Sequence, residues 1–182
     1  MNRLLSSVFV TVTLLLVCME GFSQNLKLPN DKKNSSITYS MKHPLHEWDG
    51  VSREVSSILV TDAAKSALLQ VAVRAKLATF DSKNANRDSH MIEVAEGLKF
   101  PDVTFSSSEI NLTDDKFTAK GNMIFHGVTR PVSITGTLTR QKDKLIFSGD
   151  LKVKLTEFGI EPPSLLGLVT EDEFLVRFEL VY

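Results

Sequence analysis

The chain has 182 residues, with 21 Lys and Arg against 22 Asp and Glu, and 42% of its residues are hydrophobic. This length and composition are typical of one folded domain. The two charge signs are balanced and interspersed, so the composition argues against a nucleic-acid-binding protein, which needs a concentrated basic surface. No apolar run reaches the roughly 20 residues of a membrane-spanning helix, so we expect no spanning segment after processing.

Residues 1–23 predict a cleaved signal peptide. Met1-Asn2-Arg3 gives a positive start, and residues 4–17 form an apolar stretch. Gly21-Phe22-Ser23 then places small residues at the two positions that a signal peptidase reads, which predicts cleavage before Gln24. We therefore expect an exported protein, which in a bacterial cell means the periplasm or the outside.

The single cysteine of the sequence, Cys18, lies inside the predicted signal peptide. The mature chain would have no thiol, and so neither a disulfide nor a thiolate metal site. Leu15 and Cys18 also match a lipoprotein box, but Val17 stands where that box needs a small residue. Free export is therefore favoured over a lipid anchor at Cys18.

The mature chain predicts mostly strands. Residues 24–34 are polar and predict a solvated lead-in, and residues 35–182 predict one domain. Alternation of apolar and polar residues predicts strands within 37–41, 55–61, 68–80, 103–105, 117–125, 132–139, 145–155 and 174–182. Helical spacing predicts one helix over residues 87–98, which Gly97 and Pro101 would end.

Short turns such as residues 141–144 join these strands, so neighbouring strands should run antiparallel. Many short strands with one apolar face can bury that face in a sandwich or a closed barrel, and a barrel leaves no exposed edge. Gly121, Gly136 and Gly149 lie on apolar faces, where glycine permits bending or leaves internal room. We therefore predict an all-β closed antiparallel barrel with one short helix, although each glycine could instead relieve local crowding.

Five stretches occur in the order and approximate spacing of one known family. They are Ser36-Ile37-Thr38-Tyr39-Ser40-Met41-Lys42-His43, Asn86-Arg87-Asp88-Ser89-His90-Met91, Phe100-Pro101-Asp102-Val103-Thr104-Phe105, His126-Gly127-Val128-Thr129-Arg130-Pro131-Val132 and Phe158-Gly159-Ile160. On these motifs the chain resembles the YceI-like family over about residues 35–182. The resemblance implies a lipocalin-like antiparallel barrel that binds isoprenoid or other long-chain lipids, in proteins that are often exported.

The resemblance also implies where a ligand would lie. The barrel lining would include Tyr39, Met41, Phe80, Met123, Phe125, Phe147, Leu151, Val153, Phe174, Val176 and Phe178. Trp48, Arg87 and Leu165 would lie at the barrel mouth, near Tyr39, and the apolar loop 159–170 would act as a portal flap or as a lid packed over the barrel end. The same inward residues would also make an ordinary packed core, because sequence does not distinguish a hollow barrel from a filled one.

No catalytic set stands out in the sequence. It has no Gly-x-Ser-x-Gly, no His-Glu-x-x-His and no glycine-rich phosphate loop. His43 and His46 lie three apart in a Pro-containing turn, which favours a surface or hydrogen-bonded role over a metal site. For the Arg87-Asp88 pair we expect an architectural role, in which Asp88 accepts N–H groups of the first helical turn and Arg87 pairs with a carboxylate.

The sequence therefore favours an exported, non-enzymatic carrier of a long amphipathic lipid of isoprenoid or isoprenoid quinone type. We expect no cofactor, no metal and no nucleic-acid partner, and whether the chain forms a homodimer stays open. Two alternatives also remain. One is a protein-interaction module with a filled barrel, and the other is an enzyme that uses His43, His46 or His126 as an acid–base group.

Overall fold

The computed structural model describes residues 25–165 and 167–182, without the side chain of Leu165. The predicted signal peptide, Cys18 and Leu166 lie outside the described residues. The strands are β1 (Leu26–Pro29), β2 (Ser36–His43), β3 (His46–Ser52), β4 (Ser56–Thr61), β5 (Leu68–Lys76), β6 (Asp102–Thr113), β7 (Lys116–Phe125), β8 (Val128–Gln141), β9 (Lys144–Lys154), β10 (Ser164–Leu165), β11 (Leu168–Val169) and β12 (Glu173–Val181). The helical elements are α1 (Ala85–Val94) and two short 3-10 helices, η1 (Leu77–Thr79) and η2 (Thr156–Phe158).

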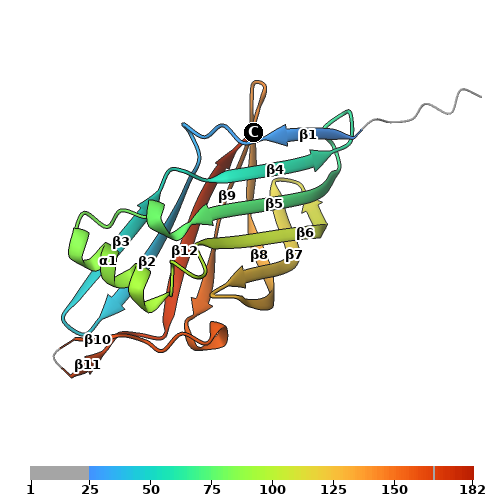
Figure 1. Cartoon of the computed structure of the whole chain (residues 1–182). Coiled ribbons are helices and arrows are strands. Elements are labelled where there is room, and N and C mark those ends of the chain that lie inside the picture. The colour runs from blue at the N-terminus through green and yellow to red at the C-terminus, as the bar shows by residue number, and fades with distance from the viewer. Residues whose placement is uncertain (1–24, 166) are drawn as a thin grey trace, which may run out of the picture.

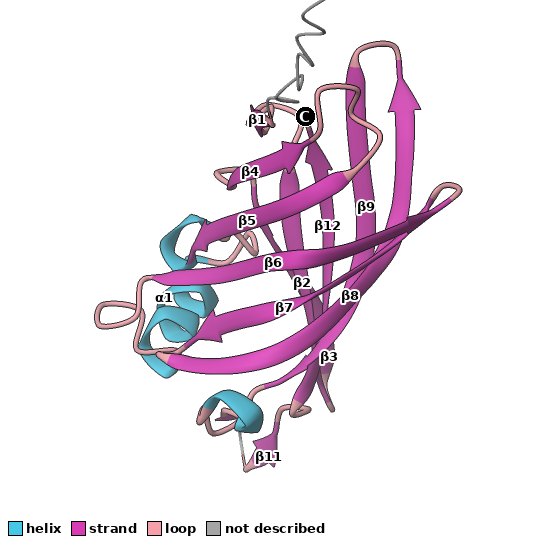
Figure 2. Cartoon of the chain, turned by 90° about the vertical axis from the view of Figure 1, so that its right-hand side faces the viewer, coloured by secondary structure: helices cyan, strands magenta, loops and turns pink. Residues whose placement is uncertain are grey.

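Ten strands form one antiparallel sheet in the order β1-β4-β5-β6-β7-β8-β9-β12-β2-β3, and β10 and β11 form a separate small hairpin. The sheet curls strongly about its inner face, and α1 lies at one end of the curl (Figures 1 and 2). The predicted all-β fold with one helix is confirmed. None of the helices that the structure describes has both the length and the hydropathy needed to cross a membrane.

The predicted closed barrel is not formed as a continuous ladder. The sheet has two edges, β1 and β3, and is a curled half-barrel. Across the gap, Val51 of β3 exchanges two backbone hydrogen bonds of 3.0 Å with Asp81, which follows η1. The chain turns a corner between β3 and β4, where Ser52 and Val55 are fully buried. The edge strand β3 thus pairs with the segment between η1 and α1. In a closed barrel it would pair with another strand of the sheet.

The predicted solvated lead-in contains a strand. β1 pairs antiparallel with β4, from Leu26 opposite Thr61 to Pro29 opposite Ile58. The polar composition of the segment predicted a solvated lead-in. The segment forms a strand because it pairs with β4, about 30 residues further along the chain. Pro29 lacks an N–H donor and suits its place at the end of an edge strand.

The turn after β1 joins opposite walls of the half-barrel. Asn30 is buried, its side chain donates to Val55 O at 3.1 Å, and it accepts from the Ser57 N–H at 2.8 Å. The Asp31 N–H donates to Val181 O at 2.6 Å. We call this end of the molecule, formed by the turn, the start of β4 and the end of β12, the closed end.

Three glycines let neighbouring strands approach closely. A Cβ atom at Gly121, Gly136 or Gly149 would overlap a backbone carbonyl oxygen of the adjacent strand. Gly136 of β8 lies directly opposite Gly149 of β9. These glycines therefore relieve crowding between backbones in a bent sheet, and they do not create internal space.

The helix begins and ends earlier than predicted. Its N-cap is Asn84, whose side chain accepts from the Arg87 N–H at 3.1 Å. Glu96 has a left-handed φ of 45°, which ends the helical segment before Gly97. No residue of α1 is fully buried, so the helix covers the interior as a partly exposed flap.

Two hydrophobic clusters fill the inside of the curl. One lies near α1 and η2 and includes Met41, Leu77 and Phe158. The other lies at the closed end and is formed by Val55, Leu59, Leu68, Phe117, Ala119, Ile134, Leu138, Leu145, Phe147 and Leu180. These side chains are about nine-tenths buried or more, so the closed end is well shielded from solvent.

Candidate functional site

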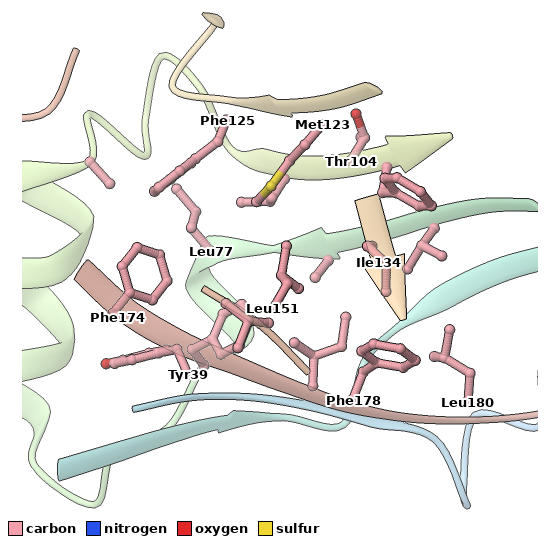
Figure 3. Close-up of a pocket in the computed structure, with 18 of the residues that line it drawn as sticks. Tyr39, Leu77, Thr104, Met123, Phe125, Ile134, Leu151, Phe174, Phe178 and Leu180 are labelled. Carbon is pink, nitrogen blue, oxygen red and sulfur yellow. The ribbon is translucent and has the colours of Figure 1, made fainter. Parts of the chain in front are cut away.

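A cavity of about 250 Å³ lies inside the curled sheet, between the closed end and α1 (Figure 3). Its wall is almost entirely carbon. Strand periodicity supplies that wall, because every second residue of a strand faces the interior. The cavity-facing residues of β2 and β12 are Ile37, Tyr39, Met41, Phe174, Val176, Phe178 and Leu180.

The structure places ten of the eleven predicted lining residues at this cavity. They are Tyr39, Met41, Phe80, Met123, Phe125, Phe147, Leu151, Phe174, Val176 and Phe178. Val153 does not line it. Although Val153 shares a strand face with Leu151, it is 3% exposed and packs into the core cluster that contains Phe158. The sequence left open whether the interior is hollow or filled. It is hollow in part, and residues of both hydrophobic clusters line the cavity.

Sequence reasoning missed the contribution of β5, whose Val71, Val73 and Ala75 also line the cavity. The alternation of these residues was a usable signal. It was obscured because buried Leu68 and the cavity-lining Val71 are an odd number of positions apart, which breaks the alternation along the strand. A register shift at Val60/Thr61, where Thr61 pairs with Leu68, accounts for the change of phase.

The end of the cavity beside α1, here called the helix end, carries polar atoms. The Tyr39 hydroxyl and the Trp48 indole N–H are buried and have no hydrogen-bond partner in the described part of the chain. Burial raises the pKa of Tyr39, and the Trp48 side chain partly offsets the rise as a hydrogen-bonding neighbour. The two groups lie together but do not form a well-aligned hydrogen bond. In Figure 3 the Tyr39 hydroxyl points toward α1. A Cβ at Gly50 would overlap the Tyr39 ring, so the glycine opposite Tyr39 makes this ring position available.

Arg87 joins the same end of the cavity. Its guanidinium carbon lies 5.2 Å from the centroid of the Trp48 ring, within the range of a cation–π contact. Arg87 Nε donates to Ser82 Oγ at 2.9 Å, and an Arg87 terminal nitrogen donates to Ser82 O at 2.8 Å. The predicted mouth residues Trp48 and Arg87 therefore line the cavity. The predicted third one, Leu165, has its side chain outside the described part.

The expected partners of the Arg87-Asp88 pair were wrong, although its architectural role fits. Arg87 binds Ser82 and not a carboxylate, and Asp88 accepts from the Ser82 N–H at 3.1 Å and from the Ser82 hydroxyl at 2.5 Å. Asn84 provides the helix cap that had been assigned to Asp88. The two charged residues thus hold the buried Ser82 loop against the start of α1, which fixes the position of Arg87 at the cavity.

Two histidines, His43 and His126, contact segments that are distant in the sequence. His43 is buried, its Nε2 lies 3.1 Å from Leu168 O, and its Nδ1 accepts from the Leu45 N–H at 3.2 Å. His126 Nδ1 lies 3.0 Å from Phe158 O. Within residues 25–165 and 167–182, no three His, Cys, Asp or Glu side chains come together as a metal site would require. His43 and His126 thus tie separate loops to the sheet.

The apolar loop after η2 lies at the helix end. Ile160 and Pro163 line the cavity, whereas Leu168 and Val169 of β11 are largely exposed. The arrangement fits the lid role, and the portal role stays a prediction. The first part of the loop packs over the cavity, and its small hairpin projects outward (Figure 1).

A family model described as a YceI-like domain matches residues 29–182. The chain belongs to the YceI-like family. This confirms the resemblance drawn from the five motifs. A UPF0312 protein of Azotobacter vinelandii is 31% identical over 158 residues, which cover 81% of this chain and 82% of that protein. Protein YceI of Salmonella newport is 24% identical over 161 residues and 84% of each chain.

Solved structures show the same YceI-like fold. BcnA of Burkholderia cenocepacia superposes with a TM-score of 0.74 at 20% identity, over 84% of this chain and 99% of that one. A domain of Saccharophagus degradans superposes with a TM-score of 0.68 at 14% identity, over 85% of this chain and 96% of that one. The latter is described as a polyisoprenoid binding domain implicated in plant cell wall breakdown. At these identities the likeness shows the fold alone.

Proposed function

We propose that this YceI-like protein binds a long-chain amphipathic lipid of isoprenoid or isoprenoid quinone type, without covalent bonds. The tail lies in the cavity, and the polar head lies at the helix end. One observation carries the proposal. A carbon-lined cavity ends at two neighbouring buried polar groups, the Tyr39 hydroxyl and the Trp48 N–H, that form no well-aligned hydrogen bond in the described chain.

The carbon wall supplies affinity for the tail. Each CH₂ group that leaves water for such a wall gains about 0.8 kcal/mol. The cavity of about 250 Å³ is slightly smaller than the 300–1,000 Å³ typical of small-molecule sites. A long tail would therefore fill the cavity completely, and the rest of it would extend through the helix end.

The polar end supplies a place for the head group. Leaving a buried donor unpaired costs about 1–3 kcal/mol, which a ligand oxygen can recover. The Trp48 N–H is a donor only, and the Tyr39 hydroxyl can donate or accept. A head group with an accepting oxygen fits these atoms, and Arg87 lies beside them.

The proposed activity is binding and transport, not catalysis. His43 and His126 engage backbone carbonyls of Leu168 and Phe158, so their rings serve to hold loops together. Neither residue lines the cavity. Support for binding also comes from the family, one structural neighbour of which is described as polyisoprenoid-binding.

We also propose export, with removal of residues 1–23 and release of a mature chain that begins at Gln24. Support for this comes from the sequence pattern of a positive start, an apolar stretch and small residues before the cleavage site. A carrier in the periplasm or outside the cell would give an insoluble lipid a route through water.

Native mass spectrometry of the mature protein, exported and purified without detergent, tests the function. We expect a stoichiometric adduct that is lost under denaturing conditions and extracts into organic solvent as a long-chain lipid. The same spectra give the mass of the mature chain and thus its first residue. A bare protein that also fails to take up added isoprenoids would refute the binding proposal.

A pair of variants assigns binding to the cavity. Leu151→Asp places a charge on the cavity wall, and we expect the adduct to disappear, because the carboxylate would require either water or a partner inside the cavity. Ser133→Asp places the same group on the exposed outer face of the neighbouring strand β8 and should leave the adduct unchanged. Circular dichroism must show that both variants fold like the wild-type protein. Equal lipid content in two folded variants would contradict the assignment.

A further inference from the structure

The cavity reaches the closed end of the molecule, near the C-terminus of the chain. Leu59, Val71, Leu180 and Tyr182 line this inner end. Figure 3 shows Leu180 at the side of the cavity opposite Tyr39. Behind these residues, other side chains of the closed-end cluster are packed into the core: Val55, Leu68, Leu138 and Leu145.

Tyr182 connects two distant strands, β9 and β4, at this inner end. Its backbone is fixed to β9 by two hydrogen bonds of 2.9 Å with Leu145. Its hydroxyl reaches the Ser57 hydroxyl on β4, which is six strands away from β12 in the sheet order. Ser57 donates its own proton to Ala72 O at 2.9 Å, so the Tyr182 hydroxyl is the donor in the bond with Ser57.

The ring of Tyr182 is held as firmly as its hydroxyl. It packs edge-on against Phe147, with ring centroids 5.7 Å apart and an interplanar angle of 87°. Burial is the main cause that raises the pKa of Tyr182 to about 12, so the hydroxyl stays neutral at physiological pH. A neutral aromatic ring that is fixed at this end of an apolar cavity offers a tail a stop and no free polar partner.

We infer that Tyr182 limits the length of hydrocarbon tail that the cavity accepts. The inference rests on the proposed lipid binding and adds the determinant of chain length. A tail enters from the helix end, and its terminal methyl stops against the Tyr182 ring. Each further carbon must then remain at the helix end, where it gains less from burial.

Binding of a homologous series of straight-chain alcohols, measured by isothermal titration calorimetry, tests this inference. For the wild-type protein, affinity should rise about fourfold per added CH₂ and stop rising at a definite chain length. Tyr182→Ala removes the ring, so the rise should continue to longer chains. Tyr182→Phe keeps the ring and loses only the hydroxyl, so the limit should stay at the wild-type length.

A further variant distinguishes the stop from a general loss of packing. Val176→Ala trims the cavity wall between the two ends, and it should weaken binding of all alcohols while leaving the limiting length unchanged. Tyr182→Leu provides a milder change if Tyr182→Ala does not fold, and its limit should also lie beyond that of the wild-type protein.

The outcomes separate the two proposals. If the wild-type protein binds none of the alcohols, the proposed function fails and the length limit fails with it. If the wild-type protein binds the series but the folded Tyr182→Ala and Tyr182→Leu variants keep its limiting length, the inference is overturned while lipid binding stands. An affinity that rises without limit in the wild-type protein would overturn it equally.

Discussion

At the scale of single residues, the buried Tyr182 hydroxyl couples ionisation to folding. Its pKa is raised from 10.0 to about 12, chiefly because burial disfavours the phenolate. The neutral hydroxyl therefore contributes to the free energy of unfolding. This contribution is fully present below pH 10 and is lost as the pH rises through about 12. Two pKa units correspond to about 3 kcal/mol. We expect the free energy of unfolding in urea to fall between these pH values more steeply for the wild-type protein than for Tyr182→Phe.

The comparison with Tyr182→Phe isolates this one group. Lysine side chains also titrate in this range, but they do so in both proteins, so their contribution cancels in the difference. Parallel pH profiles for the two proteins would show that the hydroxyl is as accessible in the folded state as in the unfolded state.

At the scale of elements, Asp172 holds the segment that leads from β9 over the cavity. Its carboxylate accepts from the Thr156 N–H at 2.9 Å and from the Thr156 hydroxyl at 2.7 Å. Burial raises the pKa of Asp172, but the hydrogen bonds from Thr156 outweigh it, so the net pKa lies below 3.8. The stabilisation is therefore present above pH 3.8 and is lost as the pH falls through the lowered value.

We expect the protection factor of the Thr156 amide in hydrogen exchange to fall below pH 3.8 in the wild-type protein. Asp172→Asn should lower that protection at neutral pH and make it independent of pH in this range. Amides in the middle of β8 serve as an internal reference, since they lie far from the segment. A wild-type profile as flat as that of Asp172→Asn would contradict this role of the carboxylate.

The same scale shows what the sequence could predict. Strands β7, β8, β9 and β12 were predicted from alternation because each has one apolar face, and short turns also join β7 to β8 and β8 to β9. The sequence did not predict which residues of β5 face inward. A register shift in the pairing of β5 with β4 moves Val71 to the inner face. β1 was missed because Asn30, the residue after it, is held by hydrogen bonds to Val55 and Ser57. These partners lie 25 and 27 positions further along the chain.

The candidate site divides in the same way. Most of the residues predicted to line the cavity do so, because an apolar residue on the inner face of a strand points into the curl. The hydrogen-bond partner of Arg87 could not be predicted, because Ser82 belongs to an irregular loop that has no periodic sequence pattern. The role of Tyr182 was also hidden, since its hydroxyl pairs with Ser57, 125 positions earlier in the chain.

At the scale of the whole molecule, hydrogen bonds tie the two walls together at the closed end. Asn30→Ala would leave buried Val55 O and Ser57 N unpaired, at a cost of about 1–3 kcal/mol in the free energy of unfolding. Urea unfolding measures this loss. Asn34→Ala is a matched control, because Asn34 is exposed and bonds only to Asp31 with its side chain. Equal losses for both variants would contradict a special role for the closed end.

The void next to α1 gives the protein a mechanical property that a filled core lacks. Unfolding eliminates internal voids, so hydrostatic pressure favours the unfolded state in proportion to the empty volume. The wall atoms of the void also lack the dispersion partners that close packing would provide. A tail in the cavity would supply those partners and remove the compressible volume. The cargo would then complete the hydrophobic core, and the unloaded protein would be the softer of the two forms.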